Sequence, residues 1–323
     1  MNLLVTGGAG YIGGTVATIL MQAGHRVTVL DNLCHSKRNE VPVGAELVEA
    51  DIADRPRVEA LLRELKPEGV LHFAALIEAG DSMRVPEVYF RNNTASTLSL
   101  LEAMHATGIN KLVFSSTAAV YGEPKSTPIE ETAALAPTNA YGESKLMVEQ
   151  MLNWFHRIHG LRYASLRYFN VAGALPHRGE AHEPESHIIP LILDVALGRR
   201  ASISIFGEDY PTPDGTCIRD YIHVRDLADA HILALTALAD RDRMILNLGN
   251  GSGFSVKEVV ESARRVTGHA IPVEMKPRRP GDPARLVASS EKAKAELGWK
   301  PQISEIDRIL ASAWEWQQQR YTR

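Results

Sequence analysis

Residues Thr6-Gly7-Gly8-Ala9-Gly10-Tyr11-Ile12-Gly13 decide the fold of this chain. They follow the apolar run Leu3-Leu4-Val5 and open a stretch with helical spacing, so they form the turn between a first strand and a first helix. Glycines at positions 7, 10 and 13 permit a tight turn that a ligand can approach closely, and N–H groups at the positive end of the helix dipole favour a pyrophosphate. The pattern GxxGxxG therefore predicts a dinucleotide-binding turn, although a glycine-rich turn that only packs a helix on a strand is the simpler alternative.

An acidic residue bears on which dinucleotide is bound. Asp31 lies eighteen residues after Gly13, at the end of the second expected strand. A carboxylate there can accept hydrogen bonds from both hydroxyls of an adenosine ribose and would repel a 2′-phosphate. The sequence therefore favours NAD, while Lys37 and Arg38 nearby keep NADP open.

The first half of the chain alternates short apolar runs with stretches of helical period. This alternation predicts a doubly wound parallel α/β sheet of the Rossmann type, followed by a smaller α/β substrate lobe. We expect a dinucleotide-binding domain over residues 1–170, with a return of the chain around 222–248, and the substrate lobe over 171–323. The expected strands are Leu3–Thr6, Arg26–Leu30, Glu46–Ala50, Gly69–Phe73, Lys111–Ser115 and Arg162–Tyr168, with Met244–Leu248 returning to the sheet.

Composition narrows the class of partner. The formal net charge is -4, with both signs scattered along the chain, which argues against nucleic acid and membrane partners and favours a small molecule. Cys34 and Cys217 are far apart, so the sequence indicates neither a disulfide framework nor a metal site. No stretch near Met1 has the form of a signal peptide, and we expect a cytoplasmic protein.

Two further segments lie where ligands bind in such sheets, at the carboxyl ends of strands. Asp51-Ile52 follows the third expected strand, and Phe73-Ala74-Ala75 ends the fourth. We expect both to contact the cofactor, although Asp51 could instead cap the next helix.

The chemistry is expected at Tyr141-Gly-Glu-Ser-Lys145, where the i,i+4 spacing sets a phenol and an ammonium on one helix face. A tyrosine base at neutral pH needs its pKa lowered by about 3 units, or about 4 kcal/mol. One unit charge at about 7 Å contributes about 2.4 kcal/mol at an effective dielectric near 20, so Lys145 and an oxidised nicotinamide together suffice. We therefore expect Tyr141 to be a strong base mainly when NAD is bound.

Ser115-Ser116-Thr117 ends the fifth expected strand at the same sheet edge. Its hydroxyls could hydrogen-bond a substrate oxygen that loses a proton, with Thr117 as the candidate, or could be an ordinary polar end of a strand. A Tyr-Lys pair alone is common on helix surfaces, and the combination of these segments carries the prediction.

Together these residues resemble the extended short-chain dehydrogenase/reductase family over nearly the whole chain. Several stretches narrow the resemblance to the branch that epimerises UDP-hexoses at C4. They are the glycine-rich turn, Asp31-Asn-Leu-Cys34 with Ser36-Lys37-Arg38, Leu166-Arg-Tyr-Phe-Asn170, and Tyr210-Pro-Thr-Pro-Asp-Gly-Thr216 with Ile218-Arg-Asp-Tyr-Ile-His-Val224.

The resemblance implies a role for each matching position. It assigns Tyr141, Lys145 and Thr117 to catalysis and a UDP-sugar to the second lobe. The NAD-binding set is Gly7, Gly10, Tyr11, Ile12, Gly13, Asp31, Asn32, Ser36, Asp51, Ile52, Phe73, Ala74, Ala75, Asn92, Ser115, Tyr141, Lys145 and Tyr168. The substrate-binding set is Thr117, Asn170, His187, Ile188, Phe206, Arg219, Arg279 and Asp282. Among these, the arginines suit the diphosphate, although Arg219 could merely pair with Asp220 or Asp226, and Arg279 could belong to a solvated basic run.

Some positions depart from that branch. Leu76-Ile77 stands where many of its members have a lysine near the cofactor, and His187 stands where some have asparagine. Leu286 matches the position that helps set the room for the 2-substituent of the sugar, so acceptance of N-acetylated sugars stays open. Homodimers are usual in the family, and the Leu98–Met104 helix is a candidate interface.

The implied activity is the interconversion of UDP-glucose and UDP-galactose through a 4-keto sugar. A 4,6-dehydratase would need an added acid and base just after Thr117, where this chain has Ala118 and Ala119. Another UDP-sugar as substrate, or a non-catalytic NAD-sensing protein on the same fold, remain the alternatives.

Overall fold

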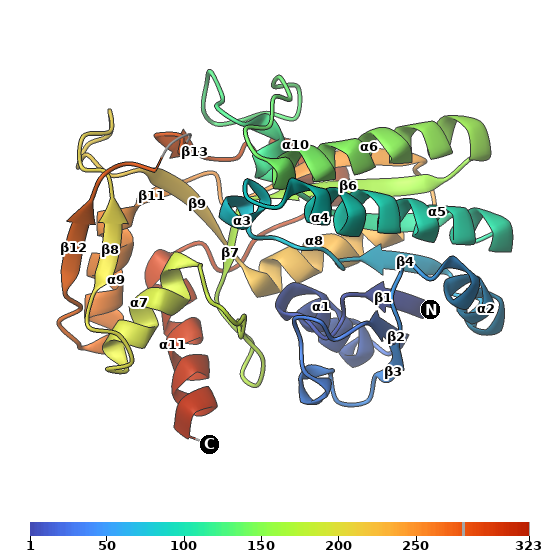
Figure 1. The fold of residues 1–323 in the computed structure, drawn as a ribbon, viewed down its shortest axis with the longest axis horizontal. Coiled ribbons are helices and arrows are strands. Elements are labelled where there is room, and N and C mark those ends of the chain that lie inside the picture. The colour runs from blue at the N-terminus through green and yellow to red at the C-terminus, as the bar shows by residue number, and fades with distance from the viewer. Residues whose placement is uncertain (280–281, 323) are drawn as a thin grey trace. The chain divides into compact units, whose positions relative to one another are not determined.

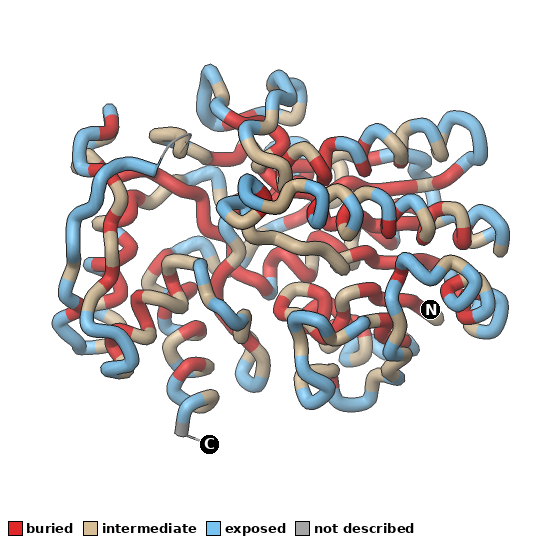
Figure 2. Tube along the Cα trace, in the orientation of Figure 1, coloured by how far each residue is buried: buried red, intermediate tan, exposed pale blue. Residues whose placement is uncertain are grey.

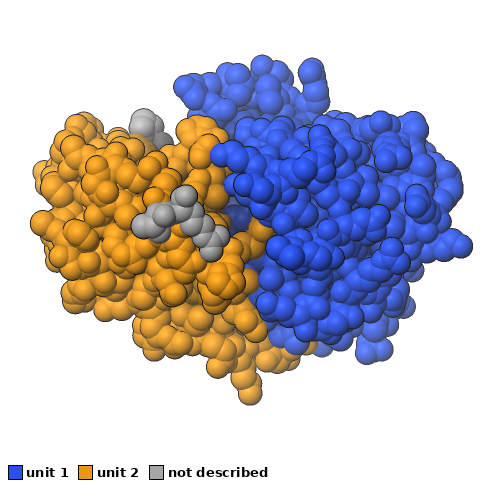
Figure 3. All heavy atoms as spheres, turned by 90° about the horizontal axis from the view of Figure 1, so that it is seen from below, with its two compact units in different colours: residues 1–122, 135–167, 228–246 blue, residues 123–134, 168–227, 247–323 orange. Residues whose placement is uncertain are grey.

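The computed structural model describes residues 1–279 and 282–322. The chain forms two compact units (Figure 3). Unit 1 comprises residues 1–122, 135–167 and 228–246, and unit 2 comprises residues 123–134, 168–227 and the chain from 247 onward. The sequence indicated a return of the chain near 222–248, but nothing in it singled out residues 123–134 as part of the second unit.

A seven-stranded sheet forms the centre of unit 1 in the described part of the chain (Figure 1). Its order is β10-β6-β5-β4-β1-β2-β3, and β1 pairs in parallel with both β2 and β4. This is the doubly wound order, whose direction reverses between β1 and β4, and it confirms the predicted fold class. The strands are β1 (Asn2–Thr6), β2 (Arg26–Asp31), β3 (Glu46–Glu49), β4 (Gly69–His72), β5 (Lys111–Thr117), β6 (Arg162–Tyr168) and β10 (Arg243–Leu248).

The expected strands agree with the observed ones to within one residue at each end, except at β5. That strand continues two residues beyond Ser115, because Ser116 and Thr117 are both buried and both find polar partners. Buried hydroxyls with partners cost little, so a polar sequence can continue a buried strand.

Helices cover the sheet because their apolar side chains face it. In α2 (Arg55–Leu65), Val58, Leu61 and Leu62 are buried in the same cluster as Leu4 of β1, and Asp54 caps the helix by accepting from the Arg57 N–H at 3.1 Å. Figure 2 shows the strands of the sheet as largely buried. The other elements here are α1 (Tyr11–Gln22), η1 (Arg38–Glu40), α3 (Ala79–Ser82), α4 (Pro86–Tyr89), the π-helix η2 (Phe90–Ala95), α5 (Ser96–Thr107), η3 (Ala118–Tyr121), α6 (Ala140–His159) and α8 (Val224–Ala237).

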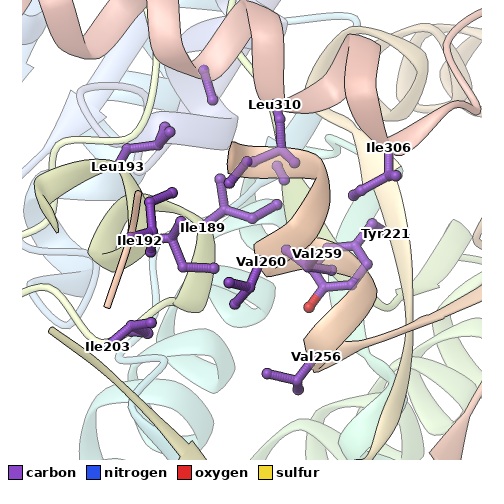
Figure 4. Close-up of a cluster of buried hydrophobic side chains, with 14 of the residues drawn as sticks. Ile189, Ile192, Leu193, Ile203, Tyr221, Val256, Val259, Val260, Ile306 and Leu310 are labelled. Carbon is purple, nitrogen blue, oxygen red and sulfur yellow. The ribbon is translucent and has the colours of Figure 1, made fainter. Parts of the chain in front are cut away.

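Unit 2 has its own core. Ile189 and Leu193, Val259 and Leu310 come from three helices and pack together with Ile203 (Figure 4). Strand β9 is central to a small sheet, where it pairs with three short strands. The elements are β7 (Asn170–Ala172), α7 (Ile188–Ala196), β8 (Ile203–Phe206), β9 (Ile218–His223), β11 (Gly253–Ser255), α9 (Val256–Thr267), β12 (Val273–Lys276), β13 (Arg285–Leu286), α10 (Glu291–Leu297) and α11 (Ile306–Thr322).

Within the described residues, every helix is too short or too polar to cross a lipid bilayer.

Candidate active site

The glycine-rich turn lies at the point where the strand order reverses. A Cβ at Gly7, where φ is +70°, would lie 2.5 Å from the Ala74 nitrogen, and one at Gly13 would lie 2.4 Å from the Gly7 oxygen. Backbone therefore packs on backbone at both positions, and only glycine fits. At Gly10 the nearest atoms to a Cβ are the Gly7 oxygen at 3.3 Å and Ser36 Oγ at 3.9 Å. This cradle fits the pyrophosphate of a dinucleotide.

The residues expected at the adenosine ribose lie together. Asp31 accepts hydrogen bonds from the Ala9 and Leu33 N–H groups at 3.0 and 2.9 Å, so its carboxylate is held at the end of β2. The Asn32 amide donates to Asp51 at 2.9 Å. Asp54 rather than Asp51 caps α2, which excludes the simpler interpretation of Asp51.

One of the two cations that kept NADP open is engaged elsewhere. Arg38 forms an ion pair with Glu49 of β3. A guanidinium paired in this way has lost its strongest attraction to a 2′-phosphate, while the Asp31 carboxylate still repels one. The ribose end of the cradle therefore suits NAD.

A buried chain of hydrogen bonds that the sequence did not reveal supports the ends of β1 and β4. His72 bonds Thr6 at 2.6 Å and Thr97 at 2.8 Å, and Thr97 donates to the Asn93 carbonyl at 2.6 Å. Burial lowers the pKa of His72 to about 3, so the ring is neutral at physiological pH.

The π-helix η2 contributes Asn93, whose side chain connects these hydrogen bonds to α6. The Asn93 side chain accepts from the Leu76 N–H at 2.8 Å and donates to the Leu76 carbonyl at 2.9 Å and to Ser144 Oγ at 3.1 Å. Its neighbour Asn92, the residue expected to bind NAD, donates to Asn93 Oδ1 at 3.0 Å. The only sequence signal for Asn93 was a pair of adjacent asparagines. Phe73, another expected cofactor residue, lies against the His231 ring, with centroids 4.8 Å apart.

Helix α6 places the proposed catalytic pair. Asn139 caps the helix by accepting from the Gly142 N–H at 2.8 Å, which starts the helix just before Tyr141. The Thr117 side chain interacts with the Tyr141 phenol and lowers its pKa. Lys145 is only 2% exposed, and its Nζ donates to the Ser115 carbonyl at 2.9 Å, 5.0 Å from the centroid of the Phe114 ring. Ser115 thus contacts this lysine through its backbone oxygen.

The pKa of each group shows what the protein alone supplies. Burial raises the pKa of Tyr141 to about 12, and the Glu78 charge adds to this, while the Thr117 hydrogen bond opposes it. Burial also lowers the pKa of Lys145 to about 7. The expected lowering at Tyr141 is therefore absent from the protein by itself, because desolvation outweighs the Thr117 hydrogen bond. A phenolate here needs a further positive charge, which an oxidised nicotinamide carries.

Gly142 offers a test of how closely α6 approaches the segment after Thr117. A Cβ there would lie 2.7 Å from the Ala119 oxygen. Alanine favours helices over glycine by about 1 kcal/mol, yet in Gly142→Ala the helix must move away from Ala119, taking Tyr141 with it. We expect kcat to fall by about tenfold or more, as measured by steady-state kinetics. An unchanged kcat would contradict this packing.

Unit 2 brings together several residues expected to bind substrate. Arg219 forms an ion pair with Asp282. The simpler partners are occupied: Asp220 accepts from the Asn250, Gly251 and Ala288 N–H groups at 2.8 to 3.1 Å, and Asp226 accepts from two N–H groups at 2.9 and 2.8 Å. The simpler interpretation of Arg219, an ion pair with Asp220 or Asp226, is therefore excluded. Binding of the substrate diphosphate stays the prediction for this residue.

A second pair lies close by. The Arg279 guanidinium stacks 3.9 Å from the centroid of the Phe206 ring. The charges of Arg219, Asp282 and Arg279 all act on the Cys217 thiol, whose pKa is raised mainly by burial. Charges from both pairs therefore lie within electrostatic range of the same thiol.

The remaining expected substrate residues are spread over the same unit. Asn170 lies on β7 opposite Tyr221 of β9 and hydrogen-bonds its side chain. His187 precedes Ile188, the first residue of α7, and Leu286 lies opposite Arg219 in the pairing of β13 with β9. Tyr168, which is expected at the cofactor rather than at the substrate, ends β6 and is buried.

One acidic cluster in unit 2 has the spacing of metal ligands. Glu180, Glu185 and His187 have ligand atoms within 4.8 Å of one another. Ion pairs account for this grouping, because Glu180 binds His182 at 2.9 Å and Glu185 binds His187 at 2.8 Å. Each carboxylate also accepts from the backbone N–H groups of the next two residues.

Comparison with known proteins identifies the family. Over 314 residues the chain is 54% identical to a UDP-glucose 4-epimerase of Streptomyces lividans and 52% identical to one of Corynebacterium glutamicum, each match covering 97% of this chain and 95% of the relative. A solved UDP-glucose-4-epimerase of Stenotrophomonas maltophila, with bound NAD and formylated UDP-arabinopyranose, is 42% identical with a TM-score of 0.96, covering 100% of this chain and 99% of that one. The model of the NAD dependent epimerase/dehydratase family matches residues 3–249. The chain therefore belongs to this family of NAD-dependent enzymes.

Proposed function

We propose that this enzyme interconverts UDP-glucose and UDP-galactose by inverting the configuration at C4 of the hexose. The relatives above carry that activity at more than half identity over nearly the whole chain. The observation that carries the proposal in this chain is the contact between the Tyr141 phenol and the Thr117 hydroxyl, one turn of α6 from the buried Lys145. Acid–base catalysis at a sugar hydroxyl needs such a pair of groups.

The residues of unit 1 perform the proton transfer. NAD held at the glycine-rich turn of unit 1 would supply hydride transfer from and to C4. Tyr141 takes the proton of the 4-hydroxyl, and Thr117 hydrogen-bonds the same oxygen. The Lys145 ammonium, held by the Ser115 carbonyl, stabilises the phenolate. When the hydride returns, Tyr141 gives the proton back to the oxygen.

Inversion requires the 4-keto sugar to present its other face. Firm binding of UDP with loose binding of the hexose allows this, because tight contacts to one face of the sugar would stop the rotation. Arg219 and Arg279 hold the diphosphate, and Phe206, His187, Ile188 and Asp282 hold the uridine; all six residues belong to unit 2. Asn170 holds the diphosphate together with the arginines.

Arg219 tests the diphosphate assignment. In Arg219→Lys the planar fork of donors becomes a point charge, so we expect KM for UDP-galactose to rise by about tenfold with a smaller change in kcat. Arg265→Lys is the matched control, because Arg265 is an exposed arginine of α9 paired with Asp307. Equal KM values for the two variants would contradict the assignment of Arg219 to the diphosphate-binding site.

The activity is tested with purified protein and UDP-galactose, first without added cofactor and then with NAD. We expect an equilibrium mixture with UDP-glucose, and a rise in NADH absorbance if the intermediate accumulates. Failure to convert UDP-galactose when NAD is bound would reject the proposed substrate. The same assay with UDP-N-acetylgalactosamine determines whether Leu286 leaves room for the larger 2-substituent.

We also propose a homodimer and a cytoplasmic location. α5 and α6 contact each other, and they expose Leu98, Met147, Trp154 and Ile158, the last at 67%. Exposed apolar residues in this number on adjacent helices favour association with a second copy. Sedimentation equilibrium gives the mass in solution. Cys34 and Cys217 are free thiols, the state that a reducing compartment maintains.

A further inference from the structure

The helix face that carries Tyr141 and Lys145 continues to a third polar residue, Glu149, which the proposed chemistry does not use. The spacing of four residues sets these side chains in a row. Each contacts a different residue at the end of β5: Tyr141 bonds the Thr117 side chain, Lys145 the Ser115 carbonyl, and Glu149 the Ser116 hydroxyl. The row therefore joins α6 to three successive residues of one strand.

Glu149 is the most constrained member of this row. It is 5% exposed and accepts hydrogen bonds from Ser116 Oγ at 2.6 Å, Ser165 Oγ at 2.9 Å, and Arg167 through Nε at 2.9 Å and Nη2 at 2.5 Å. Arg167 is 2% exposed. A buried bidentate pair with its remaining acceptor sites filled has one well-defined geometry.

The same guanidinium reaches the segment that follows Thr117. Arg167 Nη1 donates to the Tyr121 hydroxyl at 2.9 Å, and the guanidinium lies 5.1 Å from the centroid of that ring. Ser116 directly precedes Thr117, and Tyr121 ends the 3-10 turn η3 that directly follows it. The network therefore holds the backbone on both sides of Thr117.

We propose that the Glu149–Arg167 pair is a positioning device that sets the separation between the Thr117 hydroxyl and the Tyr141 phenol. This inference rests on the proposed function, because it takes those two groups to handle the sugar oxygen. Glu149 and Arg167 act only through their neighbours. A displacement of about 1 Å at reacting groups lowers rates by about 100-fold, while UDP binding depends on unit 2, so the pair acts on kcat rather than on KM.

Two serines provide a matched test. Ser116 and Ser165 are both fully buried and both donate to the same Glu149 oxygen, but only Ser116 adjoins Thr117. In the NAD-loaded enzyme, we expect Ser116→Ala to lower kcat by about tenfold with KM for UDP-galactose within about threefold, and Ser165→Ala to stay close to wild type. Equal effects of the two variants, or none from Ser116→Ala, would overturn the proposal.

The pH dependence of kcat provides a second test, because a loss of stability alone would not shift it. Because the Thr117 hydrogen bond lowers the pKa of Tyr141, a looser contact leaves that pKa higher. We expect the acid limb of kcat to shift to higher pH in Ser116→Ala and not in Ser165→Ala. An unshifted limb in both variants would count against a positioning role.

The ion pair itself is tested with a double variant, because removal of one partner leaves a buried uncompensated charge and can prevent folding. Glu149→Leu combined with Arg167→Met replaces both charges with apolar groups of similar length, a change that proteins often tolerate. We expect this enzyme to keep NAD and UDP affinity and to lose about 100-fold in kcat. Wild-type kcat in the folded double variant would reduce the pair to a packing role.

These outcomes are separate from failure of the proposed function. A wild-type enzyme that holds NAD but leaves UDP-galactose unchanged would reject the function. A wild-type enzyme that epimerises, with two serine variants that behave alike, would reject only the positioning role.

Discussion

Replacement of Tyr141 by phenylalanine is expected to lower kcat for the epimerisation of UDP-galactose by about a thousandfold, within the range that one acid–base group contributes. The substitution removes the hydroxyl that contacts Thr117 and leaves the ring in place. Because Tyr141 is one of many residues expected to hold NAD, and is not among the residues expected to hold UDP, we expect the two dissociation constants to change by less than about threefold. Steady-state kinetics and calorimetric titration with UDP measure the two effects separately.

The control for this variant is Tyr163→Phe. Tyr163 is a fully buried tyrosine of β6, and it has no part in the proposed chemistry. We expect kcat close to wild type. If Tyr141→Phe retained wild-type kcat as well, the base would have to be another group, and Lys145, whose pKa is about 7, would be the first to examine.

Gly13→Ala is expected to remove the cofactor. The added methyl carbon would lie 2.4 Å from the Gly7 oxygen and 3.2 Å from the Gly8 Cα, and these are backbone atoms of a turn that cannot yield separately. The start of α1 must therefore move away from the turn, and the N–H groups that face a pyrophosphate move with it. We expect NAD affinity to fall by about 100-fold or more, measured by the NAD content of the purified protein and by titration.

Gly80→Ala provides the comparison. Gly80 lies in α3, where an added Cβ meets nothing within 4 Å, so the same change of residue type causes no collision. Its NAD affinity should match wild type. Wild-type affinity in Gly13→Ala would show that the close backbone packing at this turn is not needed for the cofactor.

The sequence predicted those features whose cause is local. Gly7 and Gly13 are needed by the turn that they form. The spacing of Val58, Leu61 and Leu62 marks the face of α2 that packs on the sheet. Both features could therefore be recognised from the sequence alone. The pair Glu149 and Arg167 could not, because its members are eighteen residues apart and meet only through the packing of α6 on the sheet.

The direction of the pKa shift at Tyr141 has the same explanation. The positive charge of Lys145 follows from the residue type, whereas desolvation depends on the packing of the whole unit around the phenol. A sequence argument therefore counts the charge and omits the burial that raises the pKa of Tyr141 and lowers the pKa of Lys145.

The interleaved course of the chain has a consequence for how the protein can be divided. A polypeptide ending at residue 167 would lack β10, and β6 would become the edge of the large sheet with its backbone donors and acceptors unpaired. Such an edge is a template for aggregation. The N-terminal half of the gene is therefore not expected to yield a stable fragment by itself, and synthesis of β10 should precede closure of the sheet.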